Sequence, residues 1–251
     1  MKLTDQSRWR YDISHATKKN LKNIRRRDEW LQVVEKFIPN DPLDYLELGC
    51  APGQYSAVLS EGKEWRVSGI DYSEDADLFI ETLGLVNKKA ELFKMDMFSE
   101  RIDRSFDIVI SIGLVEHFRG EMLDDVFKLH DSYVKPGGFV VIQMPNFTGF
   151  QYFWHYLFDR PDLDNHNIDV MQPQSLQWFA DHGYEVLFND YVGVLRLWGN
   201  SSWTHIRFLG KVVAALGILF SKIAIVFDRL GIKLRGRTWS PGLLIIAKKT
   251  L

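Results

Sequence analysis

Cysteine is nearly absent from this 251-residue chain, which holds only Cys50. A single cysteine excludes an intramolecular disulfide and a cysteine-ligated metal cluster. Long apolar runs are also missing, because the longest uncharged run in the apolar region near the C-terminus covers only residues 212–221. That run is well short of the ~20 residues that a membrane-spanning helix needs. Residues 1–30 lack the apolar core of a secretory signal, so the sequence predicts a cytoplasmic protein.

Apolar and aromatic residues are abundant, at 46% and 14% of the chain. A chain of this length can bury a full core and fits one elaborated domain better than two. We predict an N-terminal helical lid over residues 1–39 and a main domain over 40–251, with a substrate cap at 145–174 and an apolar, basic helical insertion at 205–235.

The net charge of −2 conceals an uneven distribution. Residues 1–39 carry +5 and residues 205–251 carry +8, whereas residues 40–204 carry −15. Basic ends on an acidic body suit an anionic partner such as phospholipid, a phosphorylated lipid carrier, a nucleotide sugar or RNA. A basic surface that meets only solvent is the alternative.

A glycine turn follows the first buried strand. Its residues are Leu46, Glu47, Leu48, Gly49, Cys50, Ala51, Pro52 and Gly53. Glycine permits the close approach of a nucleotide-like ligand to backbone N–H groups at such a strand-to-helix turn. Glu47 suits a cationic amino-acid end better than a pyrophosphate, which it would repel. Cys50 is expected to serve as a small packing residue.

Apolar runs predict further strands, and helical spacing between them predicts an α/β alternation. The predicted strands cover residues 65–70, 92–95, 106–112, 139–144, 184–191 and 242–248, and helices are predicted at 15–37, 124–134 and 175–182, with a Lys-Pro-Gly-Gly turn at 135–138. Asp71 ends the second strand about twenty residues beyond the glycine turn, where an acidic side chain can accept both ribose hydroxyls of a nucleoside.

The glycine turn, the segment from Val115 to Phe118 and the Pro-Gly-Gly turn occur in an order that resembles the class I S-adenosylmethionine-dependent methyltransferases, over about residues 43–192. The resemblance implies an α/β, Rossmann-like seven-stranded sheet with helices on both faces and an antiparallel last strand. It implies S-adenosylmethionine as cofactor. The implied cofactor-binding residues are Glu47, Gly49, Cys50, Ala51, Gly53, Asp71, Tyr72, Asp96, Met97, Ser111, Ile112 and Gly113.

His117 is the candidate catalytic residue, because its unperturbed pKa lies near neutrality. It could accept a proton from a hydroxyl or ammonium acceptor, form part of the active-site wall, or make a structural hydrogen bond. The candidate substrate-binding residues are Tyr11, Glu116, Phe150, Trp154 and His166. The acidic residues near His166 match no calcium loop, so the sequence predicts no metal site.

The insertion at 205–235 is apolar with few charges. If it is helical, its basic residues fall within an arc of roughly 80°; they are Arg207, Lys211, Lys222, Arg229 and Lys233. A basic stripe on an apolar helix is typical of an interfacial anchor on an anionic membrane at the inner face. Helices packed against the domain or in a homodimer are the alternative.

The cap and the basic tail make the chain similar to methyltransferases of bacterial surface-polysaccharide biosynthesis. This similarity implies a small-molecule, glycan or lipid-linked acceptor, with a sugar hydroxyl or amine as the reacting group. A quinone-like lipid acceptor and a non-catalytic cofactor-binding protein are the alternatives. A nucleic-acid partner is not expected, because residues 111–114 lack the Asn/Asp-Pro-Pro-aromatic motif of many base-amine methyltransferases.

Overall fold

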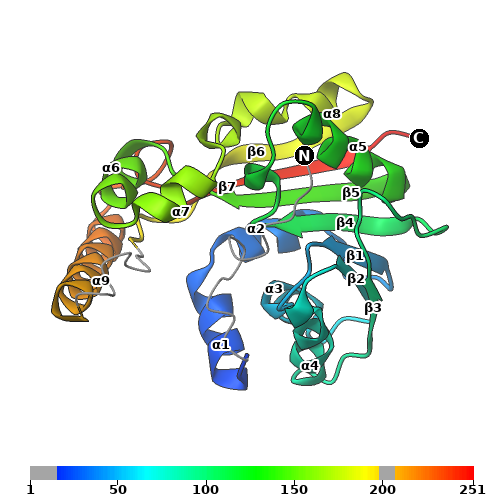
Figure 1. The fold of residues 1–251 in the computed structure, drawn as a ribbon, viewed down its shortest axis with the longest axis horizontal. Helices are drawn as coiled ribbons and strands as arrows, with labels where there is room; N and C mark the ends of the chain where they lie inside the picture. The colour runs from blue at the N-terminus through cyan, green and yellow to red at the C-terminus, as the bar shows by residue number, and fades with distance from the viewer. Residues whose placement is uncertain (1–15, 198–206) are drawn as a thin grey trace.

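The computed structural model of the protein describes residues 16–197 and 207–251. They include one seven-stranded sheet in the order β3-β2-β1-β4-β5-β7-β6 (Figure 1). The strands are β1 (Asp44–Leu48), β2 (Arg66–Asp71), β3 (Ala90–Lys94), β4 (Phe106–Ile112), β5 (Val134–Pro145), β6 (Tyr184–Val192) and β7 (Gly242–Lys249). β7 runs antiparallel to β5 and β6, and the remaining adjacent strands are parallel. The predicted fold class is therefore confirmed.

Helices cover both faces of the sheet (Figure 1). One face carries α1 (Lys18–Arg27), α2 (Trp30–Phe37), α3 (Gln54–Ser60) and α4 (Leu78–Gly84), and the other carries α5 (Glu121–Tyr133) and α8 (Trp178–Asp181). The strands supply both cores because successive side chains of a strand point to opposite faces. In β1, Tyr45 belongs to the hydrophobic cluster on the face covered by α1 to α4. Leu46 and Leu48 belong to the cluster on the face covered by α5 and α8.

Four short 3-10 helices connect these elements within residues 16–197 and 207–251. They are η2 (Glu74–Asp77), η3 (Val115–His117), η4 (Ile168–Val170) and η5 (Pro173–Leu176). The helix predicted at 175–182 is wrong in extent, since η5 and the four-residue α8 replace it.

The N-terminal segment forms two helices where the periodicity predicted one. α1 begins at its N-cap Thr17, whose side chain accepts a hydrogen bond from Asn20 N at 3.2 Å, and it ends at Asp28, which has extended backbone angles. Buried Asp28 then accepts hydrogen bonds from Tyr55 Oη at 3.2 Å and Arg196 Nη1 at 2.6 Å. This carboxylate thus ties the α1–α2 junction to α3 and to the chain after β6.

The turn predicted at residues 135–138 is part of a strand. β5 begins at Val134, and its register with β4 shifts between the Phe106 and Ile108 pairings, so this segment is a bulge. Gly138 is required there, because a Cβ would lie 2.9 Å from Asp107 O. A bulge accommodates the extra residues without ending the strand.

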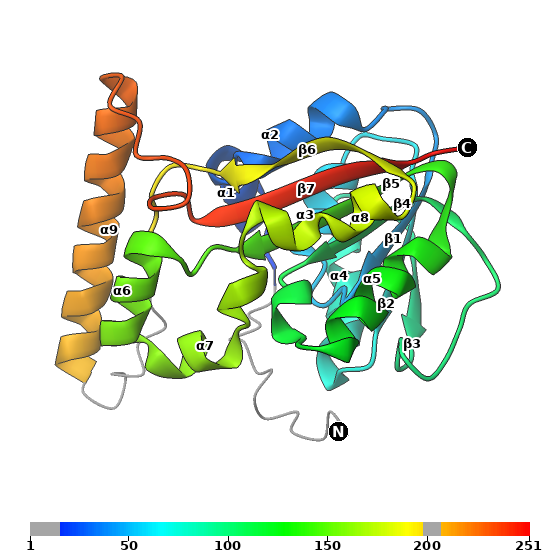
Figure 2. The ribbon, with the colours of Figure 1, turned by 90° about the horizontal axis from the view of Figure 1, so that it is seen from above.

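The cap and α9 (Arg207–Arg229) lie beside the carboxyl end of the sheet (Figure 2). The cap contains α6 (Gly149–Phe158) and α7 (Arg160–Asn165). α6 and α9 contact each other through Trp154 and Phe220, whose rings are 6.4 Å apart. No helix within residues 16–197 and 207–251 is long and apolar enough to cross a membrane.

We expect Gly69→Ala to destabilise the fold, because Gly69 of β2 lies beneath the glycine turn. A Cβ there would lie 2.5 Å from Cys50 Sγ and 2.9 Å from the ring of Phe79. Such overpacking should lower the free energy of unfolding by about 1–3 kcal/mol, measured by urea denaturation.

Gly84→Ala is the matched control for this substitution. Gly84 lies in α4, and a Cβ there would meet no described atom within 4 Å. This variant should keep the wild-type stability or gain up to about 1 kcal/mol. Equal stabilities for the two variants would contradict the close packing of the turn on β2.

Candidate active site

A cavity of about 620 Å³ lies at the carboxyl ends of β1 and β4. In a parallel sheet the strand order reverses between these two strands, and ligands bind at such a point. The volume is in the range of about 300–1,000 Å³ that small-molecule sites occupy. The cavity wall includes residues from the glycine turn, from the ends of β2, β3 and β4, and from the cap.

The glycine turn is held against β2. The backbone N–H groups of Gly49 and Cys50 donate to Ile70 O at 2.9 and 3.1 Å. Gly49 and Gly53 have φ angles of 67° and 80°, which favour glycine. At Gly53 a Cβ would also lie 2.7 Å from the Phe79 ring, so glycine is required there for space as well.

Glu47 lies in the cavity wall beside the glycine turn and is buried. Its Oε2 accepts a hydrogen bond from Ser56, whose Oγ lies 2.8 Å from Tyr45 Oη. Burial raises the pKa of Glu47 to about 8, and the nearby charge of Asp71 acts in the same direction. Glu47 is therefore a protonated acid at neutral pH until a cationic ligand group compensates its charge.

Asp71 organises the wall beside the turn. Its carboxylate accepts from Ala51 N at 3.0 Å and from Ser73 N at 2.8 Å. A carboxylate has about four acceptor positions, so two ribose hydroxyls can still donate to it. Asp96 accepts from Phe98 N at 2.9 Å, and the Phe98 ring packs 5.3 Å from Phe118.

The structure brings eleven of the twelve predicted cofactor-binding residues into this cavity wall; they are Glu47, Gly49, Cys50, Ala51, Gly53, Asp71, Tyr72, Asp96, Met97, Ile112 and Gly113. Ser111 is the exception and corrects the prediction. It is fully buried, and its Oγ lies 2.9 Å from His130 Nε2 on α5. Because successive strand residues face opposite sides, Ile112 faces the cavity and Ser111 does not.

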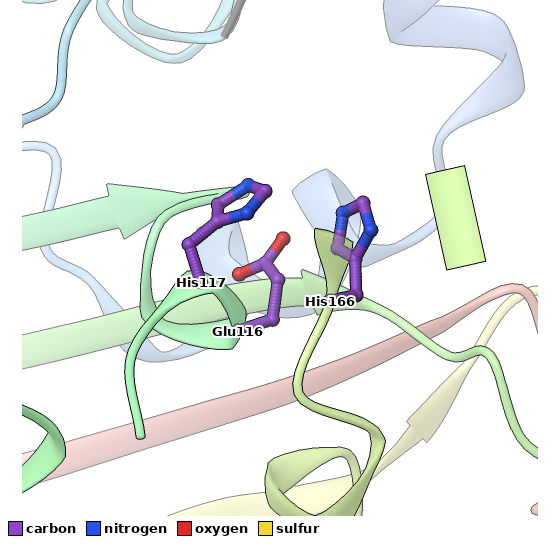
Figure 3. A group of neighbouring side chains, drawn as sticks. All are labelled: Glu116, His117 and His166. Carbon is purple, nitrogen blue, oxygen red and sulfur yellow. The ribbon is translucent and has the colours of Figure 1, made fainter. Parts of the chain in front are cut away.

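Three polar side chains meet at the side of the cavity next to the cap, which we call the acceptor end after the predicted role of the cap. Glu116 and His166 line the cavity, and His117 lies beside them, with its ring centroid 4.6 Å from that of His166 (Figure 3). Burial raises the pKa of Glu116 to about 8. The cap residue Asp162 lines the same end, and its carbonyl oxygen lies 2.6 Å from His166 Nδ1.

His117 has properties that disfavour its predicted role as catalytic base. Burial lowers its pKa to about 3, and the neighbouring His166 lowers it further. Such an imidazole is neutral at pH 7 but has little affinity for a proton. Its Nδ1 lies 3.4 Å from Asn165 O. This contact suits a side chain that orients its neighbours, or one whose other ring nitrogen, Nε2, offers a lone pair to a ligand.

Two predicted substrate residues from the cap do not line the cavity, which corrects the prediction. Trp154 is buried in a separate hydrophobic cluster beneath α9, and Phe150 stacks on Trp239 with ring centroids 5.6 Å apart. Tyr11 lies outside the described residues. Trp154 thus joins α6 to α9, and Phe150 joins α6 to the segment before β7.

Sequence reasoning predicted an N-terminal helical lid without naming its cavity residues Arg27, Asp28 and Trp30, and it missed the wall contributed by Tyr55 and by the segment after β6. The missed cavity residues include Arg27, Asp28, Trp30, Tyr55 and Arg196. Buried Asp28 joins Arg27 to Arg196 across this wall. The charged cluster at residues 25–29 was the available signal, because such a cluster inside an amphipathic segment can mark a helix break.

A family model of a methyltransferase domain matches residues 22–188 of the chain, from α1 into β6. The chain belongs to this methyltransferase family. A search of the curated proteins finds no match.

Solved methyltransferase structures share its fold. An S-adenosylmethionine-dependent methyltransferase from Archaeoglobus fulgidus has a TM-score of 0.53 and 21% identity, covering 88% of this chain and 93% of that chain. A chain from the Haloferax volcanii complex of the Trm112 methyltransferase activator with a putative methyltransferase has a TM-score of 0.57 and 16% identity, covering 93% and 95%. The N-methyltransferase NodS from Bradyrhizobium japonicum, in complex with S-adenosyl-L-homocysteine, has a TM-score of 0.50 and 11% identity, covering 92% and 86%.

We expect the methyltransferase to lose stability as the pH rises from 6.5 to 7.5. Folded Glu47 has a pKa near 8, against 4.5 for an ordinary glutamate, so the folded protein keeps a proton that the unfolded chain has released. Stability therefore falls between these two pH values, by about 1.4 kcal/mol per pH unit for each such group. Buried histidines with a lowered pKa have the opposite effect below about pH 6.5, because there the unfolded chain binds protons that the folded protein does not. The pH range of the measurement therefore starts at 6.5.

Denaturant unfolding at the two pH values measures this effect. Glu47→Gln should reduce the difference in unfolding free energy between pH 6.5 and 7.5 by about 1 kcal/mol. Glu116, whose pKa is also raised to about 8, should contribute a similar difference that remains in this variant. Glu64→Gln, at an exposed position, should keep the wild-type dependence. A Glu47→Gln variant with an unchanged dependence would show that the proton resides elsewhere.

Proposed function

We propose that this methyltransferase acts on a sugar hydroxyl or amine of a lipid-linked glycan in cell-surface polysaccharide biosynthesis. The observation that carries the proposal is a single cavity with two chemically different ends, one lined by the glycine turn and the other by the polar cap. The methyl donor is S-adenosylmethionine, which supplies an electrophilic methyl group when bound.

The residues at the first end fit this donor. The buried Glu47 carboxyl can compensate the charge of an amino group, and Asp71 retains acceptor positions for ribose hydroxyls. Asp96 and Met97 lie where an adenine amine and ring nitrogen would find an acceptor and a backbone donor. A side chain at Gly49 would lie 3.0 Å from Leu114, so this part of the wall stays as bare backbone.

The second end suits a small polar acceptor with an apolar side. Glu116, Asp162 and His166 offer oxygen and nitrogen acceptors to hydroxyl or ammonium hydrogens, and Phe147 supplies a flat apolar wall. Sugars present this combination of hydroxyls and an apolar face. The chain's own residues would hold and orient the acceptor, since proximity and alignment account for most of the rate gain in such a displacement.

The outer surface favours an acceptor with a lipid anchor. α6 and α9 expose a band of large apolar side chains; it contains Tyr152, Phe153, Tyr156, Leu157, Leu216, Ile218, Leu219, Phe220, Ile223, Ile225 and Val226. The segment that holds α6 and α7 starts just after Phe147 and ends just before His166, two residues of the acceptor end. A lipid-linked glycan could therefore reach the cavity from the surface where its anchor lies.

The charges of α9 favour an anionic membrane as the partner of this apolar band. Exposed Lys211, Lys222 and Arg229 lie on the helix, and Lys233 follows its end. Asp228, the only acidic residue between residues 205 and 251, pairs with Arg235 at 3.0 Å. Within residues 211–229 of α9, only a narrow stripe that includes Val213 and Ala224 is buried against the domain. This combination is typical of an interfacial helix.

A quinone-like lipid acceptor is the second enzymatic candidate, because the same apolar band could present such a substrate. Three polar side chains at the acceptor end favour the glycan. A non-catalytic cofactor-binding protein is the third candidate, and only an assay of methyl transfer separates it from the enzymes.

Calorimetric titration with S-adenosylhomocysteine tests the cofactor site. Asp71→Ala should weaken binding roughly 10- to 100-fold, because hydrogen bonds to a charged group contribute about 1.5–3 kcal/mol. Asp71→Asn keeps one acceptor oxygen for Ala51 or Ser73, so its loss should be smaller. Asp181→Ala, at an exposed position on α8, is the control and should bind like the wild type. Folded wild type that does not bind the ligand would refute the site.

Methyl-labelled S-adenosylmethionine and a bacterial cell-envelope extract test the acceptor in the same samples. Label in a carbohydrate-containing lipid fraction supports the proposal. Label in a lipid that contains no sugar would favour the quinone-like acceptor. Cofactor binding without label transfer to any fraction would favour the non-catalytic protein.

Co-sedimentation with vesicles at low salt tests the membrane contact. The full chain should bind phosphatidylglycerol vesicles and bind phosphatidylcholine vesicles much less. The double variant Ile218→Glu/Leu219→Glu, at exposed α9 positions, should reduce the bound fraction at least about fivefold.

Ile80→Glu, at an exposed apolar position on α4, is the control and should bind like the wild type. A wild type that stays in the supernatant would refute the membrane contact. A homodimer in light scattering that the α9 double variant dissociates would assign the apolar band to a second copy instead.

A further inference from the structure

Glu116 carries a buried carboxyl group without a hydrogen-bond partner in the described part of the chain. Its side chain is fully buried at the cavity wall, and neither Oε1 nor Oε2 has a partner among the described residues. Buried polar groups are nearly always paired, so an exception of this kind indicates a missing ligand or ion. The carboxyl group lies beside the backbone of Gly113, where an added Cβ would be 3.6 Å from Oε1.

Two imidazoles converge on this carboxylate. His117 is the next residue in the chain, whereas His166 comes from the cap, and the ligand atoms of the three side chains lie within 4.8 Å of one another. Figure 3 shows the Glu116 carboxylate between the two rings. One carboxylate and two imidazoles form a recurrent ligand set for divalent transition metals.

Backbone carbonyls orient the imidazoles. His166 Nδ1 lies 2.6 Å from Asp162 O, and since a carbonyl oxygen can only accept, this nitrogen carries the hydrogen and Nε2 keeps its lone pair. His117 Nδ1 lies 3.4 Å from Asn165 O in the same cap segment. Metal-binding histidines usually donate their second nitrogen to a carbonyl or carboxylate in this way.

We propose that Glu116, His117 and His166 bind one divalent transition-metal ion, with Zn²⁺ as the best match to the ligand set. Bonds of about 2.1 Å in a tetrahedral site place ligand atoms about 3.4 Å apart, so the side chains must close slightly around the ion. Among the described residues, the carboxyl groups of Glu116 and Asp162 lie on this side of the cavity, and Arg119 donates to His166 O at 2.7 Å. Mg²⁺ is a poorer match because it prefers oxygen ligands.

The position of this site deepens the proposed function, on which the following consequence rests. Three protein ligands leave a coordination position open toward the acceptor end of the cavity. An acceptor hydroxyl placed there would lose its proton to water more readily, because the ion polarises its oxygen. The oxygen then forms a bond to the methyl carbon while the carbon–sulfur bond breaks, and the sulfur keeps the electron pair.

A second cluster in the cap provides an internal control. His155, Asp159 and Asp162 also hold ligand atoms within 4.8 Å of one another. His155 and Asp159 do not line the cavity, although Asp162 does. An ion in this cluster would have no open position facing the acceptor.

Zinc titration of the full-length protein tests the proposal. Protein freed of metal with a chelator is titrated with ZnCl₂ by calorimetry, without S-adenosylmethionine, and one ion per chain is expected. Glu116→Gln and His166→Ala should each weaken binding by more than about 100-fold, since even second-shell changes cost about 10- to 100-fold. Asp159→Asn, in the second cluster, should bind within about threefold of the wild type.

Circular dichroism and thermal melting verify that each variant is folded. Folded wild type that binds no zinc would overturn the proposal, and so would zinc binding that survives both Glu116→Gln and His166→Ala. Loss of binding in Asp159→Asn alone would move the ion to the second cluster and also overturn it. S-adenosylhomocysteine binding in the same samples separates this failure from failure of the proposed function.

Discussion

The reversal of strand order between β1 and β4 is the constraint on which this structure depends. From β1 the chain crosses by way of α3 to β2 and β3, and from β4 it crosses by way of α5 to β5 on the other side. Because the two connections leave in opposite directions, no crossover fills the space between the ends of β1 and β4. The glycine turn and the segment from Gly113 to Glu116 form two walls of that space.

Two buried acids mark the two ends of this space. Glu47 and Glu116 both have a pKa raised to about 8 by burial, and both line the cavity. Burying a carboxyl costs stability unless a partner compensates it, so such residues are expected where a ligand supplies the partner. The difference between them is informative: Glu47 accepts from Ser56, whereas Glu116 has no partner in the described part of the chain.

The cap links the chemistry to the surface. Its two ends supply Phe147 and His166 to the cavity, and α6 in its middle packs through Trp154 on α9. α9 in turn exposes an apolar band with lysines and arginines nearby. α6 and α7 therefore connect α9 to the end of the cavity that Phe147, Asp162 and His166 line.

The sequence by itself determined the features that rest on local signals. Strands follow from apolar runs, the glycine turn from positions that need a positive φ or no side chain, and Asp71 from its spacing to that turn. Only the tertiary structure decided which side chains share a space. Strand register turned Ser111 toward His130, packing placed Trp154 beneath α9, and the cap brought His166 to His117 across 48 intervening residues. Such pairings depend on contacts between distant segments, which one sequence cannot reveal because its periodicity reports only how each segment divides into buried and exposed faces.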